Sequence, residues 1–257
     1  MTRDRAQRKQ SASLTIDGQE IPLTLRLNRR ARRFIVRVDP ATREVIVVSP
    51  SKRSTKIAVD FAREQTKWIA EQLASMPAPI PFLPDNIIPY RGVPHIIRHD
   101  ALARRGVWQQ PAPSFAGPLP EICVSGGADH VSRRVRDWLR KEARAQLAAH
   151  CLDHARALDL GSSRISVRDT KSRWGSCSPT GDLSFSWRLI LAPAFVLDYV
   201  AAHETAHRVH MNHSAAFWRV VERLVPRRQD EYDWLNEYGN DLHRFGANMP
   251  EYLSQES

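Results

Sequence analysis

The stretch Ala194-Phe-Val-Leu-Asp-Tyr-Val-Ala-Ala-His-Glu-Thr-Ala-His207 ends in two histidines that are four residues apart. Its apolar residues predict a buried helix, and Pro193 stands where the first turn of a helix tolerates proline. On a helix, positions i and i+4 lie on one face, with Cβ atoms about 5–6 Å apart. His203 and His207 can therefore converge on one Zn²⁺ ion.

The residues around the two histidines complete the pattern of a catalytic zinc site. Glu204 follows the first histidine, so it projects beside the metal and can accept a proton from a water molecule. A catalytic zinc ion takes three protein ligands and one open position. His213 is the strongest candidate for the third ligand, because it keeps the histidine spacing of the metzincin pattern. The motif thus predicts a zinc-dependent hydrolase with Glu204 as general base.

Other readings of the motif stay open. Glu222 and Glu231 are alternative third ligands on later helices, as in the thermolysin class. His210 stands where the metzincin pattern has glycine, and it is the histidine least tied to the metal. The histidines of a buried helix can also be satisfied by carboxylates or carbonyls without any metal. Against this, burying Glu204 between two histidines is costly unless it is paired or functional.

Composition and charge limit the class of protein. The 257 residues are 42% hydrophobic, enough for one large core or two smaller ones. The net charge of +10 favours attraction to polyanions, so nucleic acid is a possible partner, although no reading helix or stacking platform is recognised. Three cysteines without CxxC spacing argue against a disulfide framework. With no signal-peptide core and no apolar run of membrane length, we expect a soluble, cytoplasmic protein that does not bind membranes.

Composition also predicts two regions of different structure. Residues 1–125 are expected to be β-rich, with an antiparallel meander over 21–48 and one helix over 55–73. Residues 126–257 are expected to be helical and to carry the histidine motif, with a strand over 182–191 before it. The predicted class is α+β. The oligomeric state cannot be predicted.

The C-terminal half resembles the YgjP-like family of predicted metal-dependent hydrolases, which is related to the SprT-like and other zincin metallopeptidases. The resemblance rests on ordered motifs: Asp169-Thr-Lys-Ser-Arg-Trp-Gly-Ser-Cys-Ser178, Trp187-Arg-Leu, Ala192-Pro193, Asp198-Tyr-Val, His203-Glu-Thr-Ala-His207, Asn212-His-Ser214 and Phe217-Trp218. They cover roughly residues 165–245. The region before residue 125 resembles the family's β-rich region more weakly.

The resemblance implies a zincin-like metallopeptidase fold, in which a small sheet packs on the active-site helix. It implies zinc on His203, His207 and His213, with Glu204 as the base. It also implies that an extended substrate pairs with a strand beside the helix, for which residues 184–189 are the candidate.

Four nearby residues have two interpretations each. Arg173 and Trp174 can line the cleft with Cys177 near the metal, or the loop can be a tight turn around a packed tryptophan and a buried cysteine. Asp198 can accept a hydrogen bond from a histidine ring, or it can be an exposed helix carboxylate.

Three activities fit these observations. The first is peptide-bond hydrolysis, with a peptide or protein as substrate. The second is a metal-dependent nucleoside triphosphate pyrophosphatase, an activity sometimes assigned to YgjP-like proteins, although no Gly-rich phosphate loop is present. The third is a DNA-associated SprT-like protease or a zinc-stabilised binding module.

Overall fold

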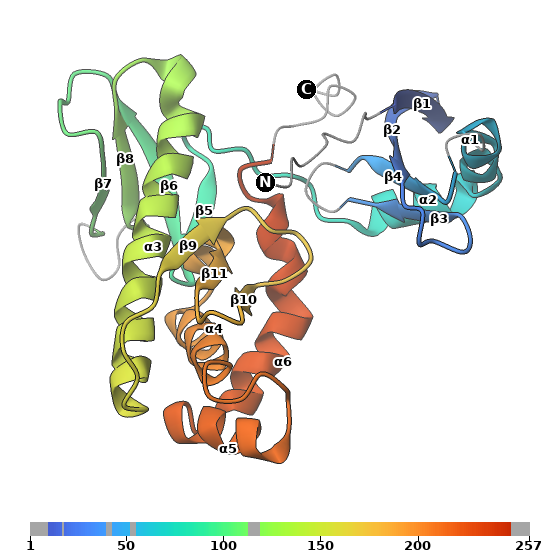
Figure 1. Ribbon diagram of the computed structural model, residues 1–257. Helices are drawn as coiled ribbons and strands as arrows, with labels where there is room; N and C mark the ends of the chain where they lie inside the picture. Colours follow the sequence, from blue (N-terminus) through green and yellow to red (C-terminus); the bar gives the residue numbers. More distant parts are fainter. Residues whose placement is uncertain (1–9, 17, 40–42, 52–54, 113–118, 248–257) are drawn as a thin grey trace, which may run out of the picture. The chain divides into compact units, whose positions relative to one another are not determined.

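The computed structural model describes residues 10–16, 18–39, 43–51, 55–112 and 119–247 (Figure 1). The chain divides into two compact units, Met1–Pro79 with Ala247–Ser257 and Ile80–Gly246. The sequence predicts a change from strands to helices near residue 125, which lies inside the second unit. No division between units falls there, because the strands before residue 125 and the long helix after it share one core, in which Ile122 and Val124 pack with Val131 and Val135.

The first unit contains a four-stranded sheet in the order β1-β2-β4-β3. Its strands are β1 (Gln10–Ile16), β2 (Gln19–Leu27), β3 (Ile35–Val38) and β4 (Val45–Ser49). The expected antiparallel meander is wrong, because β2 and β4 pair in parallel. The apolar run of β4 is almost wholly buried and takes a central position, whereas the half-exposed β3 lies at the edge.

Two helices complete the first unit where the sequence predicted one. They are α1 (Thr55–Glu64) and α2 (Thr66–Ser75), separated at Gln65. Ala58 and Ala62 of α1 and Ile69 and Leu73 of α2 are buried in the same core as the sheet. The apolar residues at helical spacing therefore cover one face of the sheet.

The second unit begins with a sheet of the same topology. Its order is β5-β6-β8-β7, with strands β5 (Ile87–Tyr90), β6 (Val93–Asp100), β7 (Val107–Gln110) and β8 (Glu121–Ser125). As in the first unit, the two central strands pair in parallel and each outer strand is antiparallel. The sequence shows no internal repeat, so this likeness is visible only in the strand pairing.

The long helix α3 (Val131–Ala157) is the framework of the second unit. One buried row recurs along it every four residues, made of Val131, Val135, Leu139, Ala143, Leu147 and Cys151. This row is the apolar stripe of an amphipathic helix. It packs with the apolar residues of the motif helix, so the two helices share one core.

The motif helix α4 (Ala194–Ala206) is central in this unit (Figure 1). It contacts α3, α5 (Ala215–Leu224) and α6 (Arg228–Tyr238). Nine of its residues are buried. A helix that is apolar on all sides needs cover on all sides, and these neighbours supply it.

A three-stranded sheet adjoins α4, in the order β10-β11-β9. The strands are β9 (Ile165–Arg168), β10 (Gly175–Cys177) and β11 (Leu183–Ser186). The expected strand over 182–191 ends at Ser186, because Trp187–Leu191 forms a buried 3₁₀ helix capped by the Ser186 side chain. The prediction of an α+β protein with a small sheet beside the motif helix and a β-rich N-terminal region is confirmed.

Candidate metal centre

The last turn of α4 and the loop after it position the three histidines. His203 and Glu204 lie in the last turn, and His207 is the C-cap residue. Backbone N–H groups of Val209 and His210 then bond to the carbonyl of Ala206, which tightens the chain into a turn.

His213 follows this turn and directly precedes α5. The hydroxyl of Ser214 caps α5 by accepting a hydrogen bond from the N–H of Phe217. Because the turn and the cap hold the loop at both ends, His213 is directed back over the end of α4.

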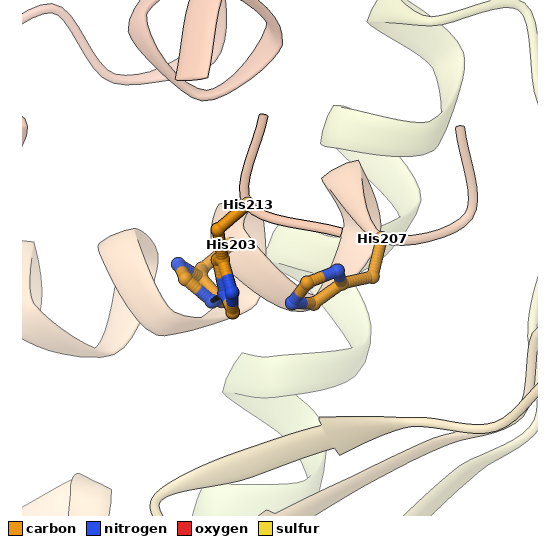
Figure 2. A group of neighbouring side chains, drawn as sticks. All are labelled: His203, His207 and His213. Atoms are coloured by element: carbon orange, nitrogen blue, oxygen red, sulfur yellow. Dashed lines mark hydrogen bonds between the residues drawn. The ribbon is translucent and has the colours of Figure 1, made fainter. Parts of the chain in front are cut away.

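The three imidazoles converge on one point, as Figure 2 shows. One ring nitrogen from each of His203, His207 and His213 lies within 4.8 Å of the others. Nε2 of His203 and Nε2 of His213 are 3.1 Å apart. Two nitrogens bound to one zinc ion at about 2.0–2.1 Å in tetrahedral geometry are separated by a little over 3 Å. The spacing therefore fits a shared metal ion.

The state of the rings also fits metal binding. Nδ1 of His207 lies 3.1 Å from the carbonyl oxygen of His210, so Nδ1–H can donate and Nε2 is left free as a ligand. Burial lowers the pKa of His203 to about 4, and the neighbouring rings of His207 and His213 add to the shift. A lowered pKa means a neutral imidazole at neutral pH, which is the form that binds metal.

Aromatic side chains of α5 hold the rings in place. Phe217 stacks on His207 with ring centroids 4.5 Å apart, and Trp218 stacks on His213 at 5.7 Å. Phe217 is fully buried. These contacts limit ring rotation, so the orientation of two candidate ligands is preset by packing.

Glu204 lies beside the histidines in a buried position, with 7% of its surface exposed. Burial raises the pKa of its carboxyl group to about 7, and the charge of Arg173 partly opposes the shift. Gly175 of β10 lies against it, because a Cβ atom at that position would be only 2.5 Å from the Glu204 side chain. A carboxyl group with a pKa near neutrality can both take up and release a proton.

A cavity of about 360 Å³ opens in front of these residues. It is lined by Gly175, Ser176, Cys177, His203, Glu204, His207, Met211 and His213. A second cavity of about 260 Å³ adjoins Glu204 on the side of Arg173, Trp174 and Tyr199. Residues 173–177 therefore line the cleft, as the functional interpretation of Arg173, Trp174 and Cys177 expects. Trp174 also packs against the core and stacks on His243, as the other interpretation expects. Burial raises the pKa of Cys177, so it is a thiol at neutral pH.

The expectation that residues 184–189 pair with an extended substrate is wrong. Its strand part belongs to β11, which is hydrogen-bonded to β10 on one side and β9 on the other. A strand with neighbours on both sides has no free backbone groups for a third. The free edge beside α4 belongs to β10, because within the described residues β10 pairs with β11 alone.

The alternative ligands are not in the histidine group. Glu222 forms a salt bridge with Arg228, with its oxygen 2.9 Å from Nε of that arginine. Glu231 is buried on α6, and its Oε2 has no hydrogen-bond partner among the described residues. His210 contributes its backbone carbonyl to His207. The geometry therefore brings together the three histidines that the sequence singled out.

Asp198 contacts two histidines that do not belong to the candidate metal centre. Its carboxylate lies 2.8 Å from Nδ1 of His150 and 2.7 Å from Nε2 of His154, both on α3. The sequence motifs do not include these two histidines. Their i, i+4 spacing on a predicted helix was the signal that could have found them.

Two further observations concern the cysteines and the helices. Cys123, Cys151 and Cys177 are all free. No helix in the described part of the chain has the length and apolar character needed to span a membrane.

Comparison with known proteins identifies a family whose model matches most of the chain. The family model described as "YgjP-like, metallopeptidase domain" matches residues 32–238. Among solved structures, the chain is similar to the metallopeptidase zymogen of Pyrococcus abyssi abylysin. The two share 22% sequence identity, and the alignment covers 37% of this chain and 94% of that one with a TM-score of 0.32. No curated protein matches the chain.

Proposed function

The chain belongs to the YgjP-like family of metallopeptidase domains, and we propose that it is a zinc-dependent hydrolase that cleaves peptide bonds. The observation that carries the proposal is the convergence of three histidine nitrogens within 4.8 Å, with a buried glutamate beside them. Three imidazoles with one open side are the donor set of a catalytic zinc site. A bound zinc ion would polarise a substrate carbonyl and make a water molecule more acidic.

Glu204 is the proton carrier in this proposal. Its carboxyl group lies in a buried position at the wall of the histidine cavity, and its pKa is raised to about 7 by burial. At neutral pH it can take a proton from water and pass it to the leaving amine. Arg173 lies close enough to favour its ionised form.

The edge of β10 is where we place the substrate backbone. Its three residues Gly175–Cys177 line the cavity beside the histidines, and the outer side of the strand is unpaired among the described residues. An extended peptide that adds to this edge forms main-chain hydrogen bonds that do not depend on its sequence. Gly175 leaves room for Glu204 directly beside that edge.

The test measures metal and turnover in matched variants. His213→Ala should lose one zinc ion per chain relative to the wild type, whereas His210→Ala should keep it, since only the backbone of His210 contacts the site. Glu204→Gln should retain the metal and lower cleavage of a peptide library about 10²–10⁴-fold. Unchanged zinc content in His213→Ala would refute the three-histidine site. Unchanged turnover in Glu204→Gln would refute the role of the base.

A second candidate function is supported by a basic hollow that adjoins the site. The hollow has a volume of about 620 Å³ and shares Arg173, Ser176 and Cys177 with the cavities beside Glu204. Arg144, Arg164 and Arg168 also line it. Guanidinium groups bind phosphate oxygens in a bidentate manner, so the hollow suits the phosphates of a nucleoside triphosphate.

A row of hydroxyl groups adds to this argument. Ser176 pairs with Ser184, and Ser184 pairs with Ser166, so one serine from each strand lies in line across the small sheet. All three line the hollow. The alternative activity is hydrolysis of a phosphoanhydride by the same metal centre.

The two activities are separated by substrate. The zinc-loaded protein is incubated in parallel with the peptide library and with ATP, and cleavage products and pyrophosphate are measured. Peptide cleavage without pyrophosphate supports the first function. Pyrophosphate release without peptide cleavage refutes the first function and supports the second. In that case Arg144→Ala should slow pyrophosphate release. Arg133 is an exposed arginine of the same helix, so Arg133→Ala should not slow it.

A further inference from the structure

A second group of metal-ligating side chains lies between α3 and α4. His150 and His154 are four residues apart on α3, so they lie on one face of it. Asp198 approaches from α4. Nδ1 of His150 and Nε2 of His154 are 2.8 Å and 2.7 Å from the same oxygen of Asp198. Asp198 makes no other ion pair in the described part of the chain.

This group is separate from the three-histidine centre. None of its members belongs to that centre, and its three donor atoms lie within 4.8 Å of one another. Asp198 precedes His203 by five residues, which is about 140° around a helix. The two groups therefore lie on different faces of α4.

The donor atoms suit a particular class of ion. Two imidazole nitrogens and one carboxylate oxygen are ligands of borderline divalent transition metals, in contrast to the all-oxygen sites of Mg²⁺ and Ca²⁺. The His154 side chain is 11% exposed, whereas those of His150 and Asp198 are each 31% exposed. One side of the group is thus open to solvent, so an ion can enter and water can fill the remaining positions.

The nitrogens that would bind the ion are the ones that lie against Asp198, at 2.8 Å and 2.7 Å from its carboxylate. A cation that enters the group would replace the protons held there, because imidazole binds metal in its deprotonated form.

We propose that His150, His154 and Asp198 form a second metal site, for a divalent late first-row transition metal ion such as Zn²⁺, Ni²⁺ or Co²⁺. The ion joins α3 to the helix that carries the catalytic motif. It is a structural clamp, because the group lies on another face of α4 from the cavity that contains Glu204.

The test counts zinc ions bound per chain by the full-length protein after equilibrium dialysis. The wild type should bind two, and His213→Ala and His150→Ala should each bind one, while the double variant should bind none. Asp153→Asn removes an exposed carboxylate from the same helix and should leave two. His150→Gln replaces His150→Ala if the alanine variant does not fold, as judged by circular dichroism.

A second readout does not depend on the catalytic centre. In the His213→Ala background, added Zn²⁺ should raise the melting temperature, and this rise should vanish when His150→Ala is added. One ion in the wild type, absent from His213→Ala, would overturn the second site and leave Asp198 as a hydrogen-bond partner of the two histidines. Two ions in both the wild type and His150→Ala would place the second ion elsewhere and would equally overturn it.

Discussion

Glu204 should destabilise the metal-free protein at neutral pH, and replacing it with glutamine should show this. The residue is buried, with 7% of its surface exposed. Within the described residues no hydrogen bond or ion pair satisfies it, and Arg173 acts only through its charge. An ionised carboxylate in such a place lacks the water that solvates it in the unfolded chain. Glutamine has almost the same shape and carries no charge.

The size of the effect follows from the pKa. Burial raises the pKa of Glu204 from its ordinary 4.5 to about 7. The difference is about 2.5, and each pKa unit corresponds to about 1.4 kcal/mol, so the group changes the free energy of unfolding by about 3 kcal/mol. The folded state binds this proton more tightly than the unfolded state. The contribution of protonated Glu204 to the free energy of unfolding is therefore fully present below pH 4.5 and is lost as the pH rises through about 7.

The assay is urea unfolding of the chelator-treated protein at pH 5 and pH 8, followed by circular dichroism. The free energy of unfolding of Glu204→Gln minus that of the wild type should be larger at pH 8 than at pH 5, by about 2–3 kcal/mol. The comparison cancels the titration of other groups, because they are common to both proteins.

Glu222→Gln is the matched control. Glu222 is a half-exposed carboxylate in a salt bridge with Arg228. Its removal breaks one half-exposed salt bridge, which contributes less than about 1 kcal/mol, so this variant should not reproduce the change expected for Glu204→Gln. A pH-independent difference for Glu204→Gln, or one that falls towards pH 8, would show that burial does not control this carboxyl group.

Three further predictions follow from contacts around the site. Gly175→Ala places a Cβ atom 2.5 Å from Cγ and Oε1 of Glu204, so turnover should fall on the order of 10²-fold with an unchanged circular dichroism spectrum; full activity would show that the Glu204 side chain is free to move away. Ser214→Ala removes the N-cap of α5 and should lower the free energy of unfolding by about 1 kcal/mol in urea titrations; an unaltered midpoint would rule out the cap. Burial alone would raise the pKa of Asp169, but the hydrogen bond and charge of Arg188 lower it. Ionised Asp169 therefore stabilises the folded state at neutral pH, and this contribution is lost as the pH falls through the pKa of Asp169 in the folded protein. Asp169→Asn should have the lower free energy of unfolding at pH 7 and should approach the wild type in acid; a difference in free energy that persists at low pH would contradict this.

The histidine motif could be predicted from sequence because its information is local. The rise and rotation per residue of a helix place His203 and His207 on one face whatever the rest of the chain does. The apolar pattern of 194–206 likewise indicates burial on all sides without reference to any partner. The third ligand was harder to predict, since the sequence offered Glu222 and Glu231 as alternatives to His213. In the structure, the loop after α4 and the cap at Ser214 bring His213, and neither glutamate, to the other two histidines.

The strand pairing could not be predicted in the same way. Alternation along a strand says which residues share a face but not which neighbour it pairs with. The central place of β4, the shared topology of the two four-stranded sheets and the free edge of β10 all depend on hydrogen bonds between distant segments. For the same reason the composition change near residue 125 does not coincide with the division of the compact units.

Asp198 shows the same limit at the level of one side chain. The sequence presents it as a carboxylate five residues before a histidine, with a histidine partner or solvent as equal alternatives. The packing of α3 against α4 brings it to His150 and His154, 44 residues away from the latter. Helical periodicity is a property of neighbouring residues and is determined by the sequence alone, whereas contact between two helices depends on the whole core that packs between them, and only the tertiary structure decides it.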